Sequence, residues 1–440
     1  MSPAGLLPWG NYPRFPQTPL DCNWREDAGE CLAQLGQAGS GGALPFGSGM
    51  SYGDSCLAAS DHVIRIRPLD RFIAADWTTG VLSAEAGATL EEILAVCIPR
   101  GWFLPVTPGT RYATLGGAIA NDVHGKNHHR RGTFGRHVRR FSLVRSDAGR
   151  SICSPDGQPD LFCATIGGLG LTGIIEWAEI QLVPIRAAHV AGITQRFGDL
   201  GEFFALSDEL DQQHEFCVSW VDCLARGSRL GRGVYSAGNF SDEGGLVVDA
   251  ARRTTFPLTP PVSLVSRMSL RAFNELYWRK ASRTRTQMES GYGKFFYPLD
   301  AIVKWNRMYG PRGFQQYQCI IPEAAARDGI HALLQAVAAG GTGSFLAVLK
   351  RCGEMPSPGL LSFPMAGTTL ALDFPQTNDL DSGLFPKLDA IVREAGGRLY
   401  PAKDAHMSGE DFRRSYPAWR EVEKLRDPAL LSRFWRRVMQ

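Results

Sequence analysis

Residues 107–140 constrain this chain more than any other stretch, because they join closely spaced small residues to a run of cations. Gly116-Gly117-Ala118 lies near the start, and the part between Val123 and Phe141 holds six Lys or Arg, four His and no acid. Glycines at this density let a backbone approach a ligand closely and leave amide N–H groups free for oxygen atoms. The run 116–120 therefore predicts a pyrophosphate site on the main chain, and the basic residues after it predict contact with a second anion.

Two further glycine clusters flank this stretch. The first, residues 46–54, lacks the G-x-G-x-x-G spacing and is not followed directly by a helical pattern, so it does not favour a Rossmann nicotinamide site. A phosphate-cradling loop and a plain tight turn are both compatible with it. The second cluster is 167–173. Glycine loops, short helices and strands in this order predict an α+β nucleotide-binding domain rather than a regular βαβ alternation.

Length and composition narrow the class of protein. At 440 residues the chain is long enough for two domains, or for one domain with a large insertion. Its 47 basic and 44 acidic residues leave a net charge of only +3, which argues against a nucleic-acid binder. The ten cysteines show no C-x-x-C pair and no zinc-like spacing with His, so we expect reduced, mostly buried thiols and no metal site.

The sequence also bears on localisation. The first residues have no basic segment and no apolar core typical of a signal peptide, and the longest uncharged run, 332–349, has the pattern of a buried helix, a turn and a strand. These features predict a soluble cytoplasmic protein.

Periodicity predicts further regular elements. Thr89-Leu90-Glu91-Glu92 forms a capping box, apolar residues recur at helical spacing from Leu90 to Ile98, and Gly101 ends the pattern. Short helices are also expected at 160–166, 418–425 and 430–438. Strands are expected at 62–67, 81–86, 138–145, 174–183, 315–321, 344–349 and 368–374.

The sequence pattern changes near residue 186: the expected loops become longer, and aromatic residues appear singly among polar ones. This change predicts a second domain built on a sheet. Its segment 252–285 mixes prolines and apolar residues with eight basic residues and one acid, Glu275. We expect a mobile basic and apolar loop there, either one that docks on anionic lipid or a plain surface loop.

Four motifs in the same order resemble the flavoenzymes of the vanillyl-alcohol-oxidase family, which carry a PCMH-type FAD-binding domain. They are PGTRYATLGGAIANDVHGKNHH at 108–129, YPLD with WNRMYGP at 297–311, QYQCIIP at 316–322 and GRLYPAKD at 397–404. The resemblance extends over nearly the whole chain. It implies an α+β fold, in which a two-subdomain FAD-binding domain carries an inserted α+β cap domain built on an antiparallel sheet.

The same resemblance implies domain limits and cofactor contacts. Residues 1–186 and 397–440 would form the FAD domain, and 187–396 the cap over the isoalloxazine. The residues expected to bind FAD are Phe46, Gly47, Ser48, Gly49, Met50, Ser51, Tyr52, Gly53, Asp54, Ser55, Gly109, Thr114, Leu115, Gly116, Gly117, Asn121, Asp122, Val123, His124, Ile174 and Tyr400.

Family members of the kind most similar to this chain oxidise the ribose 2′-hydroxyl of a polyprenyl-phosphate sugar, with hydride passing to flavin N5. The keto sugar would then go to a short-chain reductase partner, completing epimerisation to the arabinose form. The residues that this resemblance places around the substrate are Tyr52, His124, Lys126, Trp220, Gln318, Lys350, Asp373 and Lys403.

The residue types suit this chemistry. Alcohol oxidation by a flavin needs a C–H bond aimed at N5, an acceptor for the hydroxyl proton, and positive charge near N1 and the C2 carbonyl. Lys403 is expected to supply that charge and to contact the substrate. Either His124 or Tyr52 would relay the proton. Lys126 and the arginines beyond it would meet the substrate phosphate.

Departures from the family pattern carry their own expectations. Met50 stands where many members have a His that attaches FAD covalently, so we expect non-covalent FAD. Phe296, Thr369 and Ala371 stand at pocket positions that are Tyr, Asn and Cys in related enzymes. The altered lining bears on the identity of the sugar or lipid, and the missing thiol predicts insensitivity to inhibitors that bond to it.

Several alternatives accompany these expectations. His128, His129 and His137 are expected to be structural or solvated, since no carboxylate accompanies them at a useful spacing. The charges of residues 130–140 would also suit a solvated face. An FAD enzyme acting on a soluble polyol, sugar or nucleoside is the alternative enzyme, and a non-catalytic binder of phosphorylated polymers is the alternative class. Peripheral association with the inner membrane would suit a lipid-linked substrate.

Overall fold

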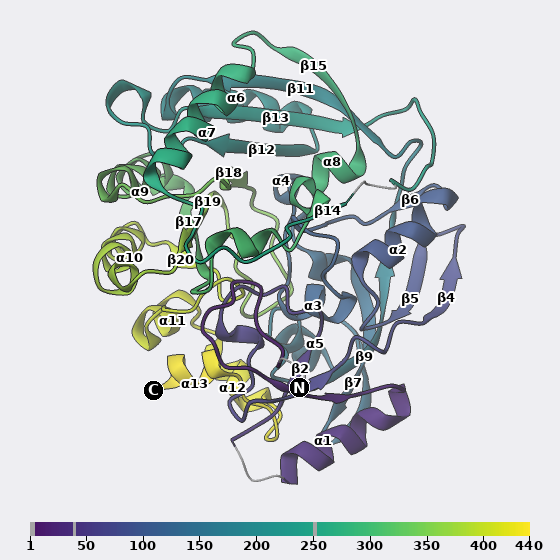
Figure 1. Ribbon diagram of the computed structural model, residues 1–440. Helices are drawn as coiled ribbons and strands as arrows, with labels where there is room; N and C mark the ends of the chain where they lie inside the picture. Colours follow the sequence, from purple (N-terminus) through teal and green to yellow (C-terminus); the bar gives the residue numbers. More distant parts are fainter. Residues whose placement is uncertain (1–4, 38–40, 250–252) are drawn as a thin grey trace.

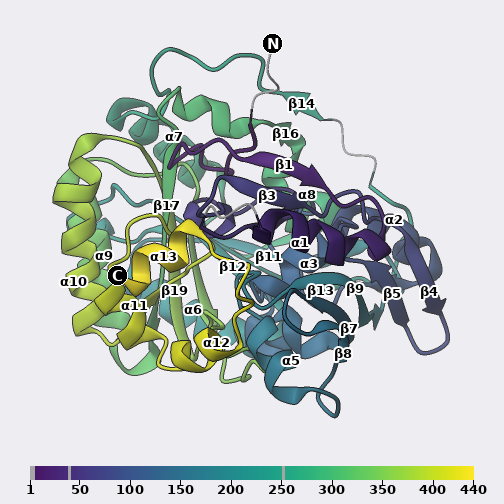
Figure 2. The same cartoon turned by 90° about the horizontal axis from the view of Figure 1, so that it is seen from below.

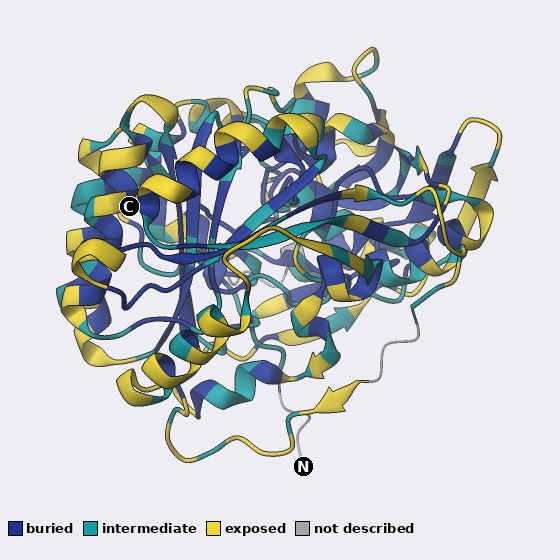
Figure 3. Cartoon of the chain, turned by 90° about the horizontal axis from the view of Figure 1, so that it is seen from above, coloured by how far each residue is buried: buried dark blue, intermediate teal, exposed yellow. Residues whose placement is uncertain are grey.

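Two large antiparallel sheets and one small parallel sheet organise the chain (Figure 1). The computed structural model describes residues 5–37, 41–249 and 253–440. In Figure 1 the five-stranded sheet lies on the right, and the eight-stranded sheet extends from the top of the molecule to its left side. Strands of the large sheet are mostly buried, whereas the helices around it turn exposed faces outward (Figure 3).

The first part of the chain forms the two smaller sheets. The parallel sheet has the order β1-β3-β2, and the antiparallel sheet has the order β4-β5-β9-β7-β8. Their strands are β1 (Thr18–Asp21), β2 (Leu44–Phe46), β3 (His62–Arg65), β4 (Phe72–Asp76), β5 (Val81–Glu85), β7 (Val138–Arg145), β8 (Gly149–Cys153) and β9 (Ile174–Gln181). The four strands expected in this region are confirmed, with ends within two residues.

The middle of the chain forms the eight-stranded sheet, with the order β15-β11-β13-β12-β18-β19-β17-β20 and antiparallel neighbours throughout. Its strands are β11 (His189–Phe197), β12 (Phe216–Val221), β13 (Gly233–Phe240), β15 (Thr286–Gly291), β17 (Phe314–Pro322), β18 (Ala347–Cys352), β19 (Gly367–Pro375) and β20 (Arg398–Leu399). Two short pairs complete the strands: β6 (Trp102–Phe103) with β10 (Val183–Pro184), and β14 (Thr254–Thr255) with β16 (Ile302–Val303).

Strand β18 starts later than the predicted 344–349. The side chain of Ser344 turns back onto the Leu346 carbonyl, and its amide donates to Cys223 Sγ over 3.4 Å. These bonds use groups that a strand would need for its ladder, so pairing with β19 begins at Ala347.

Thirteen α-helices occur in the described part of the chain. They are α1 (Ala28–Gln37), α2 (Leu90–Cys97), α3 (Leu115–Ala120), α4 (His128–Arg131), α5 (Pro159–Thr165), α6 (Leu200–Gln213), α7 (Arg267–Lys280), α8 (Tyr292–Phe296), α9 (Ala326–Gly340), α10 (Phe385–Glu394), α11 (Gly409–Ser415), α12 (Trp419–Leu425) and α13 (Arg433–Met439). The capping box of α2 is confirmed: Thr89 accepts from the Glu92 amide, and Glu92 accepts from the Thr89 amide over 2.8 Å.

Side-chain alternation gives the large sheet two different faces. On β17, Tyr317 points to the helical side, where its hydroxyl donates to Asp389 of α10 over 2.9 Å. The residues on either side of it, Gln316 and Gln318, line a cavity on the opposite face. Because successive strand residues face opposite sides, one short sequence serves both the core and the cavity.

The prediction of a mobile loop at 252–285 is wrong over residues 267–280, and its residue 252 lies outside the described residues. Residues 267–280 form α7, whose N-cap Ser266 accepts from the Ser269 amide. Leu270 and Asn274 are buried on one face of this helix, and Trp278 donates to the Phe197 carbonyl over 3.0 Å. The basic composition obscured this periodicity, because inward-facing residues are few and two of them are polar.

The C-terminal segment returns to the first part of the chain. Leu430 forms a parallel bridge with Ala43, and Ser432 forms an antiparallel bridge with Ala58. These pairings explain why α13 begins at Arg433 rather than at residue 430, as its apolar spacing predicted. In Figure 2, α13 lies beside α11 and α12, and the three helices run along one side of the molecule.

Two further expectations can be compared with the described residues. All ten cysteines are free, and eight are buried, which confirms reduced thiols. Within residues 5–37, 41–249 and 253–440, no helix combines the length and the apolar character needed to cross a membrane.

The buried ion pairs of Arg437 generate a stability prediction. Its guanidinium bonds to Asp54 and Asp404, whose side chains are only 7% and 2% exposed. Arg437→Gln leaves both carboxylates without their cation, so we expect the free energy of unfolding to fall by about 3 kcal/mol in urea denaturation. Arg436→Gln is the matched control: this exposed neighbour makes only a 3.4 Å bond to the Ala59 carbonyl, and its loss should cost under about 1 kcal/mol. Equal losses in both variants would contradict the prediction.

Candidate active site

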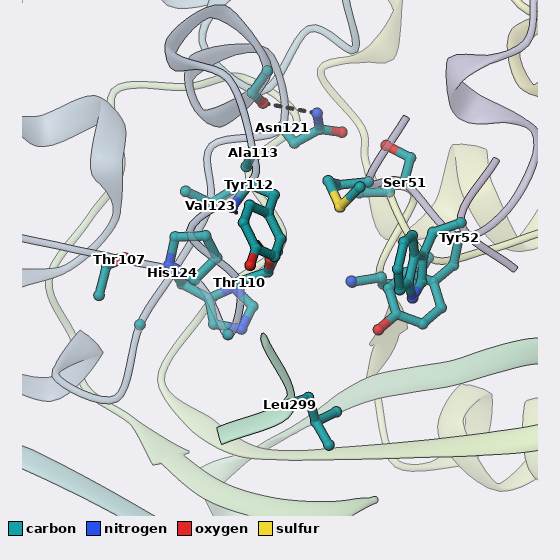
Figure 4. A pocket seen from close by; sticks show the side chains of 18 of the residues that line it. Ser51, Tyr52, Thr107, Thr110, Tyr112, Ala113, Asn121, Val123, His124 and Leu299 are labelled. Carbon is teal, nitrogen blue, oxygen red and sulfur yellow. Dashed lines mark hydrogen bonds between the residues drawn. The ribbon is translucent and has the colours of Figure 1, made fainter. Parts of the chain in front are cut away.

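A cavity of about 870 Å³ lies between the inner face of the eight-stranded sheet and the glycine loops of the first part of the chain. That volume is at the upper end for a pocket that takes a small molecule, and it allows a large cofactor together with part of a substrate. Figure 4 shows the arrangement: Ser51 and Tyr52 stand on one side, His124 and Val123 on the other, and Leu299 closes the space between them.

The loops that precede α3 form one wall. Thr114 is the N-cap of α3, and its Oγ1 accepts from the Gly117 amide over 3.2 Å. A Cβ at Gly47 would lie 2.4 Å from this Oγ1. Glycine at 47 therefore allows the first glycine cluster to pack directly on the helix cap.

This wall offers unpaired donors. In the described part of the chain, the amides of Ser48, Gly49 and Met50 donate no hydrogen bond, and the buried Oγ of Ser55 has no partner. Gly49 has φ of +65°, which turns successive N–H groups toward one side of the loop. Such a concave set of donors fits the oxygen atoms of a diphosphate.

A second wall carries the cations of the 124–126 loop and of β18. Lys126 Nζ donates to the Phe295 carbonyl, and Lys350 Nζ donates to the Gly125 carbonyl. Burial, aided by Lys350, lowers the pKa of Lys126 to about 7, and burial lowers the pKa of Lys350 as well. No carboxylate within the described residues makes an ion pair with either lysine, so both are available for an anionic ligand.

His124 lies between these walls. Gln318 Nε2 is 3.3 Å from His124 Nε2, and the imidazole stacks obliquely on Tyr400 with ring centroids 5.5 Å apart. Burial, with the nearby charges of Lys350 and others, holds the pKa of His124 well below its usual value. The imidazole is therefore neutral near pH 7 and can accept a proton.

The third group of residues centres on Lys403. Its Nζ lies 3.6 Å from the ring centroid of Tyr52, within range for a cation–π contact. Burial lowers the pKa of Lys403 to about 7, opposed by Asp373. Burial also raises the pKa of Asp373 to about 7, opposed by a 2.6 Å bond from Gln316 and by Lys403. Burial and the Asp373 charge raise the pKa of Tyr52, so its phenol stays protonated.

Most residues expected at the site line this cavity. Those that do are Gly47, Ser48, Gly49, Met50, Ser51, Tyr52, Ser55, Gly109, Thr114, Gly116, Gly117, Asn121, Val123, His124, Lys126, Trp220, Gln318, Lys350, Tyr400 and Lys403, together with Phe296, Thr369 and Ala371. Those placed behind the lining are Phe46, Gly53, Asp54, Leu115, Asp122, Ile174 and Asp373.

Three of the residues behind the lining hold the loops that form it. Asp122 accepts from the Gly135 amide over 2.8 Å and from the hydroxyls of Ser357 and Ser362, which ties the α3 loop to the segment before β19. A Cβ at Gly53 would lie 1.7 Å from the Asp404 carbonyl, so glycine permits this close approach. Asp54 is engaged by Arg437.

The arginines at 130–140 are not brought to the cavity. Arg131 pairs with Glu215, and Arg139 and Arg140 both pair with Glu179. These arginines are therefore absent from the cavity lining, which includes Lys126 and Lys350, and the alternative of a charged outer face describes them better.

Sequence reasoning missed several lining residues. Gln316 adjoins the cavity because it shares a strand face with Gln318, and the period-2 alternation of the QYQCIIP motif was a signal for it. Leu299 lies in the YPLD motif and Trp305 in the WNRMYGP motif, but the resemblance assigned neither side chain a role at the site. Trp9 gave no local signal, because only the path of the N-terminal segment brings it to the cavity.

One group of side chains has ligand atoms close enough for a metal ion. Within the described residues, one potential ligand atom each of His129, Asp211 and Cys217 lies within 4.8 Å of the others. His129 Nε2 is 3.0 Å from the His214 carbonyl, and Tyr235 donates to Asp211 over 2.6 Å. The sequence has no carboxylate at a useful spacing from these histidines, but the fold brings Asp211 of α6 close to His129 from 82 positions away along the chain. A structural role for His129 stays a prediction.

Comparison with known proteins identifies the class. A family model described as an FAD binding domain matches residues 37–152. Decaprenylphosphoryl-β-D-ribose oxidase of Mycolicibacterium smegmatis is 33% identical over 437 residues, covering 96% of this chain and 94% of that protein. An uncharacterised protein of Streptomyces coelicolor is 33% identical over 354 residues, covering 77% of this chain and 95% of that protein. Human Δ(24)-sterol reductase is 29% identical over 106 residues, covering 24% of this chain and 20% of that protein.

The chain is thus an FAD-dependent oxidoreductase, and the resemblance to the vanillyl-alcohol-oxidase family is confirmed. More narrowly, it belongs to the decaprenylphosphoryl-β-D-ribose oxidase family.

The residues present fit FAD. Free amides at 48–50 and the orphaned Ser55 hydroxyl suit the diphosphate, and a Cβ at Gly109 would meet nothing within 4 Å, leaving open space beside the main chain. Tyr400, whose hydroxyl donates to the Asn121 carbonyl over 2.9 Å, provides a flat wall beside His124. Lys403 adjoins the first glycine loop, since its Nζ lies 3.6 Å from the Tyr52 ring centroid and the Tyr52 amide donates to the Ala402 carbonyl over 3.1 Å.

The Gly47 contact generates a prediction about cofactor affinity. In Gly47→Ala, the new methyl group displaces the Thr114 hydroxyl from the α3 cap and separates the two FAD loops. We expect the dissociation constant of FAD to rise about tenfold or more, as a lost cap and distorted backbone cost upward of about 1 kcal/mol. Titration of apoprotein by flavin fluorescence measures it. Gly383→Ala, where a Cβ meets nothing within 4 Å, is the control and should bind FAD normally.

Proposed function

We propose that this enzyme oxidises the ribose 2′-hydroxyl of a polyprenyl-phosphate-linked ribose to the keto sugar, the first half of a ribose-to-arabinose epimerisation. The observation that carries the proposal is the 33% identity, over 96% of the chain, with a protein named as a decaprenylphosphoryl-β-D-ribose oxidase. The cavity supports it independently, since it combines a proton acceptor, a cation near the expected flavin ring and two further lysines.

The division of roles follows the chemistry of each group. FAD, when bound, supplies the two-electron acceptor for the carbinol hydrogen. Lys403 holds positive charge beside the place where negative charge develops, and Tyr52 orients it through the ring contact at 3.6 Å. Lys126 and Lys350 bind the phosphate of the substrate, whose negative charge would raise the pKa of both lysines and keep them charged.

His124 is the group we assign to the hydroxyl proton. Its lowered pKa keeps the imidazole neutral and able to accept, whereas the raised pKa of Tyr52 keeps the phenol protonated. A protonated phenol must lose its own proton before it can receive another. Tyr52 therefore donates a hydrogen bond in this scheme, and Gln318 fixes the imidazole orientation.

Non-covalent FAD is part of the proposal. Met50 lines the cavity at the position where a His would form the link, and a thioether has no proton to lose and no nucleophilic nitrogen. Phe296, Thr369 and Ala371 also line the cavity, so the side chains that differ from related enzymes are placed to affect which sugar or lipid binds.

We also propose the two-part arrangement, with 1–186 and 397–440 as a two-subdomain FAD domain and 187–396 as an inserted cap. The bridges of Ala43 with Leu430 and of Ala58 with Ser432 support the return of the C-terminus to the first part. Strand β20 adds a refinement, because Leu399 pairs with Cys319 and so extends the cap sheet beyond residue 396.

A keto sugar is an intermediate of epimerisation only if another enzyme reduces it on the opposite face. A short-chain reductase is the partner that we propose for that step, at the cytoplasmic side of the inner membrane where a lipid-linked sugar is accessible. Co-purification of a reductase that converts the keto product to the arabinose form would test this; conversion by the present chain alone would contradict it.

Spectroscopy tests the substrate and the cofactor linkage together. Acid precipitation of the purified yellow protein should move the flavin bands to the supernatant, because FAD is not covalently bound. Anaerobic addition of a polyprenyl-phosphoryl ribose should bleach the remaining holoenzyme, and the 2′-deoxy analogue should not. In His124→Gln we expect bleaching to slow by about 10²-fold with FAD still bound.

The same experiment separates the alternatives. Bleaching by small polyols or nucleosides, but not by the ribosyl lipid, would replace the proposed substrate with a soluble one. A colourless protein that cannot be reconstituted with FAD would contradict the oxidase assignment itself.

The pKa of Lys403 gives a pH dependence. A lysine whose pKa is lowered to about 7 loses its charge as pH rises through that value. The rate of flavin reduction should therefore fall above about pH 7 as the cation disappears. Lys403→Met should remove this limb and lower the rate by about 10²-fold. Lys387→Met, an exposed lysine of α10, is the matched control. An unchanged pH profile in Lys403→Met would assign the limb to another group.

A further inference from the structure

Exposed apolar side chains gather in one part of the chain. Of the fourteen large apolar residues that the described structure exposes, nine come from residues 247–302. The most exposed are Met268 at 82%, Leu258 at 74%, Leu276 at 72%, Val247 at 69% and Val262 at 68%. A concentration of this kind on a monomer marks a surface that meets an apolar partner.

Helix α7 presents these side chains in an ordered way. Met268, Ala272 and Leu276 are spaced by four residues, so they form one exposed stripe. The opposite face is anchored: Leu270 is buried, and Asn274 donates to Asp222 over 2.6 Å. Because these contacts hold the inner face of the helix against the protein, the apolar stripe on its outer face has a fixed position.

Cations surround the stripe. Among the described residues 253–285 there are seven basic residues and one acid, Glu275, which is already paired with Arg232 and Arg279. Arg253 and Arg285 pair with acids elsewhere. The remaining cations of this part, Arg267, Arg271, Lys280 and Arg283, take part in no ion pair within the described residues and are exposed.

The surface borders the mouth of the active-site cavity. Tyr277 of α7 and Arg253, Ile302 and Lys304 around β14 and β16 all line the cavity. Trp220, at 4.7 Å between ring centroids, joins Tyr277 to the cavity wall. In Figure 2, α7, β16 and β14 lie together along the upper edge of the molecule.

We propose that this rim, formed by 253–264, α7 and β16, docks on an anionic lipid bilayer. In this orientation the mouth of the cavity faces the bilayer. Met268, Leu276, Leu258 and Val262 would enter the boundary between head groups and acyl chains, and Arg271 and Lys280 would meet anionic head groups. Interfacial helices combine an exposed apolar stripe with flanking cations in this way. The idea that substrate passes from the bilayer into the cavity rests on the proposed lipid-linked substrate. The docking of the rim on the bilayer does not depend on that proposal.

Charge complementarity selects this partner. A protein partner of matching charge would need an acidic and apolar face of its own, and a second copy of this chain would place like-charged rims against each other. A bilayer containing anionic lipid supplies apolar depth and negative charge at once, and each exposed cation near such a surface contributes about 1 kcal/mol.

The test uses FAD-loaded enzyme and vesicles without substrate. Holoenzyme should sediment with vesicles of phosphatidylcholine containing phosphatidylglycerol, bind those of phosphatidylcholine alone more weakly, and release as salt rises. Met268→Ser combined with Leu276→Ser should weaken binding about tenfold or more. Phe72→Ser combined with Ile73→Ser is the matched control, since these residues are exposed on β4, far from α7 in Figure 1.

Two results would overturn the proposal: wild-type protein that stays in solution with anionic vesicles, or a Met268→Ser/Leu276→Ser variant that binds as the wild type does. Sedimentation velocity could give a third such result. If the wild type is a dimer and this variant is a monomer, the rim is an interface between copies of the chain.

Turnover separates this inference from the proposed function. The variant should keep wild-type flavin reduction with a ribosyl phosphate carrying a short, water-dispersed isoprenoid, and lose it with the long-chain substrate embedded in vesicles. Equal loss with both substrates would mean that the rim acts within the cavity and would overturn docking. If neither substrate bleaches wild-type enzyme, the proposed substrate fails, and vesicle binding alone decides the docking surface.

Discussion

The guanidinium of Arg437 lies between two buried carboxylates, and the geometry of the cavity depends on this arrangement. It bonds to Asp54 over 2.8 and 2.9 Å and to Asp404 over 2.8 Å. Asp54 follows the first glycine cluster, and Asp404 follows Lys403. One cation from the last helix therefore ties the loop that suits the FAD diphosphate to the segment that carries Lys403. Asp54 depends on this cation to stay buried and charged, whereas Asp404 is also met by His406 at 3.2 Å.

The cavity itself is organised by three buried lysines, none of which makes an ion pair within the described residues. Lys126 and Lys350 pair with backbone carbonyls, and Lys403 pairs with the ring of Tyr52. Burial lowers the pKa of all three, which destabilises the protein when the cavity is filled only with water. Anionic ligands reverse this effect, since each negative group raises the pKa of the lysine that it meets. The site is thus suited to anionic ligands such as FAD, and a phosphorylated substrate is the second anion that we propose.

Sequence patterns determined the local elements well where one face repeats with a regular period. The helix after Thr89 and the strand β7 appear with the predicted limits or within one residue, because capping and alternation act over a few neighbouring positions. Helix α7 escaped prediction because its inner face is maintained by Asn274 and Trp278, whose partners lie 52 and 81 positions away. Such contacts leave no periodic signal in the sequence.

The sequence by itself determined the cofactor class, since the glycines at 116–117 and the ordered motifs up to Lys403 restrict what the loops can bind. Only the tertiary structure decided which residues line the cavity and which support its loops. It placed Asp54 and Asp122 behind the lining, left the arginines of residues 130–140 outside the cavity lining, and brought Asp211 to His129. The physical reason is that a glycine loop carries its backbone geometry locally, whereas burial, charge pairing and pKa depend on side chains that meet only after the sheets have packed.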